Sequence, residues 1–139
     1  MLRRPLVLAS FAGLLAALAA GCGGSSGPPK PFAAQATVAC LKQKGFTGIT
    51  TQPSKIGFIA TFADGGGLLA HAPDGSDTVV IAFAADVAGA AATERAYRHH
   101  APKGMHINDV MSTKRNAVLV WTVTPSSDVQ TLALGCLKS

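Results

Sequence analysis

Three histidines and an aspartate are the residues of this 139-residue chain best suited to metal or acid–base chemistry. His99 and His100 are adjacent, and His106 follows with Asp109 close behind. Imidazole and carboxylate groups are zinc ligands, so His99 or His100 with His106 and Asp109 could serve a small hydrolase or metal-dependent enzyme. Adjacent helical residues point about 100° apart, however, so His99 and His100 cannot both face one ion on a regular helix. A solvated helix end is therefore the favoured interpretation.

Other enzyme motifs are absent from the sequence or weak. It contains no serine-hydrolase elbow, zinc-protease helix motif, paired-cysteine redox motif or nucleotide-binding loop. Gly65–Gly67 lacks the lysine of a phosphate loop, and Asp74–Asp77 lacks the further ligands of a calcium loop, so both predict turns. We expect no catalytic residue, no metal site and no other cofactor, and hence a protein that is not an enzyme.

The start of the chain has the three parts of an export signal. A cationic start with Arg3 and Arg4 precedes an uncharged apolar run over residues 6–20, and small residues follow before Cys22. This layout is typical of a secretory signal peptide. The apolar run is shorter than the roughly 20 residues that cross a bilayer as a helix, so we expect export and no permanent membrane span.

The sequence Leu18-Ala-Ala-Gly-Cys22 resembles the lipobox of bacterial lipoproteins. The resemblance implies cleavage before Cys22, acylation of its sulfur with chains such as palmitate, and anchoring on the extracytoplasmic side of the cell membrane. Cleavage after Ala19, which would leave Cys22 in a soluble secreted protein, stays open as the alternative. The chain thus divides into a signal peptide (1–21), a Gly/Ser/Pro tether (22–31) and a folded domain (32–139).

The other two cysteines, Cys40 and Cys136, lie in similar short sequences near the ends of two predicted helices. In an oxidising compartment they are expected to form a disulfide, with two buried free thiols as the alternative. This pairing accounts for the odd cysteine count, because Cys22 takes the lipid.

The charge of the chain argues against nucleic acid as a partner. The formal net charge is +5, and it falls to +3 when Arg3 and Arg4 leave with the signal peptide. The remaining basic residues are dispersed and have no interleaved aromatic residues, a pattern that is poor for nucleic-acid binding. Attraction to an anionic envelope surface fits this charge better.

Hydrophobic periodicity predicts one α+β domain with a mainly antiparallel sheet and about three helices, in the order α-β-β-β-α-β-β-α. Helices are expected over 32–44, over 87–100 after an Asp86 cap, and from Ser127 onward, where Gln130 completes a capping-box spacing. Strands are expected over 56–63, 68–72, 78–84, 105–112 and 117–124, with the last two forming a hairpin, and residues 46–51 are expected to form a short extended piece before the first strand.

The two faces of the predicted sheet differ in the size of their side chains. The larger residues are expected to form the core: Phe58, Phe62, Ile81, Phe83, Leu119 and Trp121. The opposite face is small but apolar and includes Thr61, Ala82 and Val120. Either a helix packs closely on that face, or it is an accessible site for a lipid, a peptide or an envelope protein.

These features together favour a membrane-anchored, non-catalytic binding or interaction domain of the cell envelope. Its short strands, alanine-rich helices and paired cysteines also resemble those of small lipoproteins from high-GC Gram-positive bacteria, a resemblance that supplies no catalytic residue. The alternatives are an enzyme that uses His99, His100 or His106, and a secreted stabiliser or inhibitor of an envelope protein.

Overall fold

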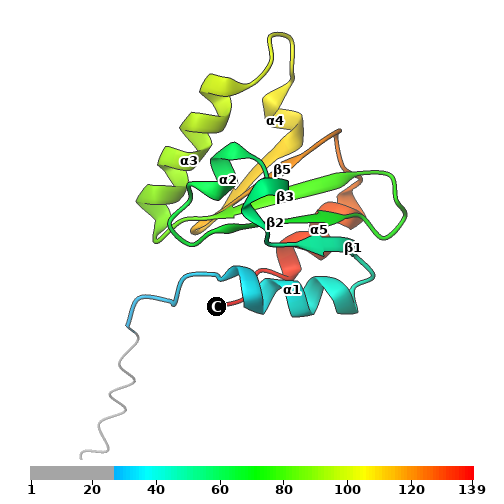
Figure 1. Ribbon diagram of the computed structural model, residues 1–139, viewed down its shortest axis with the longest axis horizontal. Helices are drawn as coiled ribbons and strands as arrows, with labels where there is room; N and C mark the ends of the chain where they lie inside the picture. The colour runs from blue at the N-terminus through cyan, green and yellow to red at the C-terminus, as the bar shows by residue number, and fades with distance from the viewer. Residues whose placement is uncertain (1–26) are drawn as a thin grey trace, which may run out of the picture.

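The computed structural model describes residues 27–139, so the predicted signal peptide and Cys22 lie outside the described residues. Residues 27–139 form an α+β domain with an antiparallel sheet, as predicted. The sheet has five strands in the order β1-β2-β3-β5-β4 (Figure 1). The strands are β1 (Thr47–Thr50), β2 (Gly67–His71), β3 (Thr78–Phe83), β4 (Met111–Lys114) and β5 (Ala117–Trp121). The helices are α1 (Ala34–Gln43), η1 (Pro53–Lys55), α2 (Phe58–Thr61), α3 (Val87–His100), α4 (Ile107–Val110) and α5 (Ser127–Gly135).

The sheet is the middle layer of three. Helices α1 and α5 cover one face, and α2 and α3 lie over the other (Figure 1). The first face carries the main core, in which Ile81, Phe83, Leu119 and Trp121 are all buried, as predicted. Smaller apolar residues on the second face, including Ala82, Ala84 and Val118, meet α2 and α3.

A disulfide joins the first and last long helices. Cys40 in α1 bonds to Cys136 at the C-terminal end of α5, with the two Cα atoms 5.2 Å apart. The predicted pairing is confirmed. Because the bridge links residues 96 positions apart, it closes most of the domain into one covalent loop.

The end of the tether is fixed to the β4–β5 hairpin. The Asn116 side-chain oxygen accepts a hydrogen bond from the Phe32 N–H at 2.7 Å, and its amide nitrogen donates to the carbonyls of Phe32 and Ala84 at 3.0 and 2.8 Å. The Arg115 guanidinium lies over the Phe32 ring, 4.3 Å from its centre, and donates to the Lys30 carbonyl. The chain is therefore held to the domain from Lys30 onward.

The predicted strand over 56–63 is wrong. This segment forms the short helix α2, which begins after Gly57 at a φ of 84°. The pattern has a helical period, because Ile56 and Ala60 are buried four residues apart, whereas Phe58 and Phe62 point outward and pack on each other. The expectation that these two phenylalanines belong to the core is therefore also wrong, since they are 72% and 71% exposed.

The predicted boundaries in the C-terminal half also need correction. The expected strand over 105–112 begins with helix α4, in which Ile107 and Val110 face inward at helical spacing, and only then continues as β4. The N-cap of α5 is Ser126, whose hydroxyl accepts from the Val129 N–H at 3.3 Å. Gln130 instead donates to Ser112, so the capping box predicted at Ser127 does not form.

Gly65–Gly67 leads from α2 into β2 and is more than a turn. A Cβ on Gly67 would stand 2.8 Å from the Ala60 Cβ, and a Cβ on Gly65 would stand 2.7 Å from the Phe83 carbonyl oxygen. Glycine is required at both positions because α2 and β3 approach the backbone closely. This close approach seats α2 against the sheet.

Candidate functional site

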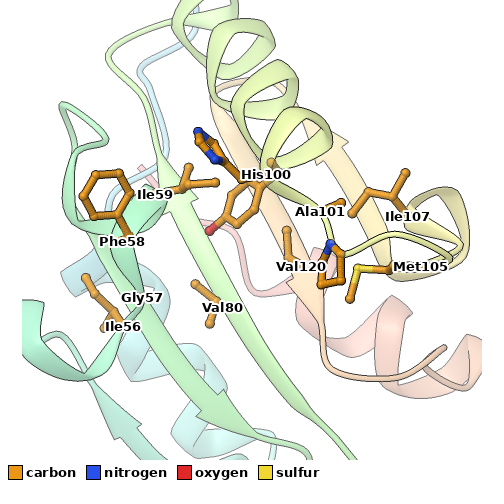
Figure 2. Close-up of a pocket in the computed structure, with 12 residues that line it drawn as sticks. Ile56, Gly57, Phe58, Ile59, Val80, His100, Ala101, Met105, Ile107 and Val120 are labelled. Carbon is orange, nitrogen blue, oxygen red and sulfur yellow. The ribbon is translucent and has the colours of Figure 1, made fainter.

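The second face of the sheet is only partly covered, and a groove of about 430 Å³ remains there. Its floor is formed by Val80 of β3 and Val120 of β5, which are direct partners in the antiparallel register and are half-buried. Figure 2 shows both valines beneath the helical segments that form the walls. The groove is therefore a part of the sheet that the chain's own helices leave open.

The walls of the groove come from two segments far apart in sequence. One wall is the start of α2, with Ile56, Phe58 and Ile59 (Figure 2). The other wall is the C-terminal end of α3 and the segment that follows it, and its lining residues are Tyr97, His100, Ala101, Pro102, Met105 and Ile107.

The two ends of α3 pack differently on the sheet. At the N-terminal end Asp86 caps the helix by accepting from the Gly89 N–H at 2.7 Å, and Ala90 packs against Ala84 and Val118. At the C-terminal end Tyr97 lies between the two small clusters on this face and packs against both. Small residues thus allow close contact at one end of α3, and the groove opens at the other.

Tyr97 and His100 are the only lining residues with polar side chains. Burial raises the pKa of the Tyr97 phenol to about 12, so this side chain is a neutral hydroxyl at physiological pH. This hydroxyl can donate to or accept from a ligand in the groove.

The remaining lining residues are apolar, which determines the chemistry of the site. Apolar walls around a few polar groups are typical of ligand pockets, and a volume of some 430 Å³ lies within their usual range. Burial of apolar ligand surface contributes about 25 cal/mol per Å². The arrangement is suited to holding an elongated apolar group with one small polar group near Tyr97 or His100.

The three residues predicted for the binding face have different fates. Val120 lines the groove. Ala82 belongs to the same sheet face but is fully buried beneath α2, together with Ile56 and Ala60. Thr61 is not on the sheet, because its segment is helical, and its hydroxyl donates to the Gly57 carbonyl at 2.8 Å. The interpretation of Thr61 as a sheet residue is therefore corrected.

The histidines predicted as alternative ligands are not brought together. His99 and His100 are exposed at the end of α3, with ring centres 5.0 Å apart, and His106 precedes α4. Among the residues that the structure describes, no three His, Cys, Asp or Glu side chains are placed to hold one metal ion. Asp109, the fourth proposed ligand, is exposed on α4.

The second aspartate of the predicted Asp74–Asp77 turn has a structural role that sequence reasoning missed. One Asp77 carboxylate oxygen accepts from the backbone N–H groups of Thr78, Thr122 and Val123 at 2.6 to 3.2 Å. Asp77 is nearly buried, so it joins the ends of β3 and β5 rather than forming a calcium site.

Sequence reasoning singled out His100 only as a candidate for metal or acid–base chemistry, and it missed Tyr97 and the other groove residues of α3 and of the segment after it. Tyr97 is the only tyrosine in the chain and lies near the start of the helix's last turn, beside the polar residues Arg95 and Arg98. A large amphipathic side chain on an otherwise alanine-rich helix was the available signal.

Comparisons with protein-family models, with curated proteins and with solved structures found no match for the chain. The structure itself therefore describes the molecule: an α+β domain closed by a disulfide, with an apolar groove on one face of the sheet. No helix within residues 27–139 has the length and apolar character needed to cross a bilayer.

Proposed function

We propose that this chain is a lipid-anchored protein of the cell envelope whose domain binds the acyl chain of a lipid without catalysing a reaction. The observation that carries the proposal is the open groove above Val80 and Val120, with apolar walls and Tyr97 among its lining residues. An acyl chain matches the apolar lining, and its polar end group matches Tyr97 and His100.

The anchoring part of the proposal rests on the sequence around Cys22. The lipobox-like sequence and the preceding apolar run support acylation of this cysteine, and the Cys40–Cys136 disulfide is consistent with export to an oxidising compartment. Two acyl chains would hold the protein stably on the membrane, since each buried CH₂ contributes about 0.8 kcal/mol.

Metabolic labelling with a palmitate analogue tests the anchor. We expect label on the full chain and none on a Cys22→Ala variant, with the unlabelled variant released from the membrane fraction. Label that persists in Cys22→Ala would contradict acylation at this residue. If the ligand were a peptide or an envelope protein instead, the fatty-acid binding assay would show no saturable binding.

Binding of a fluorescent fatty acid tests the groove. The chain beginning at residue 22, with Cys22→Ser, keeps every helix and strand described and the disulfide. We expect saturable binding that weakens at least about tenfold in Met105→Asp, because a charge then lines the apolar groove. Met105 is 40% exposed, so the substitution leaves the core unchanged.

Val123→Asp is the matched control for this assay. Val123 is an exposed apolar residue that takes the same charge but does not line the groove. We expect its affinity to equal that of the parent chain. Equal losses in Met105→Asp and Val123→Asp, or no saturable binding by the parent chain, would contradict the proposed site.

A further inference from the structure

Exposed apolar side chains are concentrated on the helical layer that forms the groove. Of the five large apolar residues that are exposed within residues 27–139, four lie in or directly after α2 or α3: Phe58, Phe62, Val87 and Met105. Phe58 and Phe62 form a tilted aromatic pair with ring centres 4.7 Å apart. Two adjacent and largely exposed phenylalanines leave an apolar surface open to solvent, which marks an interaction site.

This surface is continuous with the groove. A second depression of about 250 Å³ lies between α2 and α3 and is lined by Phe62, Ala92 and Ala96 among others. It shares Phe58, Ile59 and His100 with the groove. A ligand that crosses this surface can therefore enter the groove along the apolar side chains of Phe58 and Ile59.

The exposed row of α3 beside this surface consists of small residues, a histidine and the cation Arg95. Ala88, Ala92, Arg95 and His99 recur at helical spacing and are all exposed. The one glutamate of α3, Glu94, lies on another side of the helix, where it binds Arg98 at 2.8 Å and accepts from Thr113 of β4 at 2.9 Å. Hence no carboxylate occupies this row, and its charge complements an anionic surface.

The tether leaves the domain next to the same helix. Pro28–Pro31 run along Ala85, Asp86 and Val87 at the start of α3, and Arg115 holds the Lys30 carbonyl. The six residue steps from Cys22 to Pro28 span at most about 22 Å when fully extended. Since α3 has 14 residues and is about 21 Å long, an anchor at Cys22 keeps the bilayer within one helix length of the point where the tether meets α3.

We infer that the face formed by Phe58, Phe62, Ala92, Arg95 and His99, here called the α2–α3 face, docks on the anionic lipid bilayer to which the protein is anchored. The inference rests on the proposed anchoring at Cys22 and deepens the proposed function. The two phenylalanines insert at the boundary between the lipid head groups and the acyl chains, and Arg95 contacts lipid phosphates. The groove then opens toward the bilayer, and the acyl chain enters it from the membrane.

Tryptophan quenching by brominated lipids tests the docked orientation. The chain beginning at residue 22 is coupled through its Cys22 thiol to a maleimide phospholipid in vesicles of phosphatidylcholine and phosphatidylglycerol with brominated acyl chains. Cys40 and Cys136 do not react because they form the disulfide. Chemical coupling supplies the anchor, so the result does not depend on acylation in the cell.

Phe62→Trp places a reporter on the face, and Val123→Trp is the control at the exposed apolar residue beyond the end of β5. The native Trp121 is buried in the core and supplies the same background in both chains. We expect brominated lipid to quench about half of the added emission at position 62 and little at position 123, because only the first meets acyl chains. Phe58→Asp in the Phe62→Trp chain should abolish this difference.

Equal quenching at positions 62 and 123, or no quenching at position 62, would overturn the docked orientation. The latter is also the result expected if a protein partner, rather than lipid, covered the face. Quenching at position 62 that survives Phe58→Asp would contradict insertion of the aromatic pair. If position 62 is not quenched but the fatty acid still binds in solution, only the docked orientation is overturned. If position 62 is quenched but no fatty acid binds, only the proposed acyl-chain binding is overturned.

Discussion

Removal of the Cys40–Cys136 disulfide is expected to destabilise the domain by about 4.7 kcal/mol. The bridge links residues 96 positions apart. In the loop-entropy relation, closure of a loop near 100 residues lowers the entropy of the unfolded chain by about 16 cal/mol/K, which gives about 4.7 kcal/mol at 25 °C. Domains of this size have total stabilities of about 5–15 kcal/mol, so the bridge accounts for a large share.

Denaturation with urea measures this loss. The double variant Cys40→Ala/Cys136→Ala is compared with the oxidised parent chain, and reduction of the parent chain by a thiol separates the bridge from side-chain packing. We expect a lower midpoint in both cases and a steeper denaturant dependence, because the unbridged chain exposes more surface on unfolding. A loss below about 1 kcal/mol in both cases would refute the loop-entropy reasoning.

Three further predictions concern single residues. Asp77→Ala leaves three backbone N–H groups without their acceptor and should lower the free energy of unfolding by about 2–4 kcal/mol, more than Asp77→Asn, in urea denaturation. Gly67→Ala should destabilise the domain by about 1–3 kcal/mol, because the added Cβ would meet Ala60. Gly135→Ala is the control, since open space surrounds this position, and equal thermal midpoints for the two variants would contradict the prediction. The pKa of Tyr97 should be about 12 in the folded protein and about 10 in the unfolded chain, because burial favours the neutral phenol. The contribution of Tyr97 to the free energy of unfolding is therefore complete below pH 10 and is lost as the pH rises to 12. Ultraviolet absorbance follows this titration because the chain has no other tyrosine, and a folded midpoint near 10 would contradict burial.

The fold class could be predicted because most elements carry a local signal. Asp86 caps α3 as expected, and the alternation of Leu119 and Trp121 identifies β5 and the side of the sheet that forms the core. The disulfide was predicted from the expectation of export and from the position of Cys40 and Cys136 near the ends of predicted helices. These features depend on neighbouring residues along the chain, so the sequence reports them directly.

The candidate site could be predicted only in part, because its walls depend on contacts between distant segments. Val120 was identified by strand alternation. In the short segment that contains Phe58 and Phe62, the spacing of apolar residues fits the period of two of a strand and the spacing of four of a helix equally well. The choice between them is made by Gly57 and by the packing of Ile56 and Ala60 on Ala82 of β3. Once this segment is a helix, the phenylalanines move from the core to the surface.

Methyl NMR of the chain during titration with a medium-chain fatty acid tests whether the groove over β3 and β5 binds an acyl chain. We expect saturable shifts in the methyl groups of Val80, Val120 and Ile59, which line the groove, and none in Val123 or the core residue Leu41. Shifts that are centred on Val123, or spread through the core without saturation, would contradict binding in the groove.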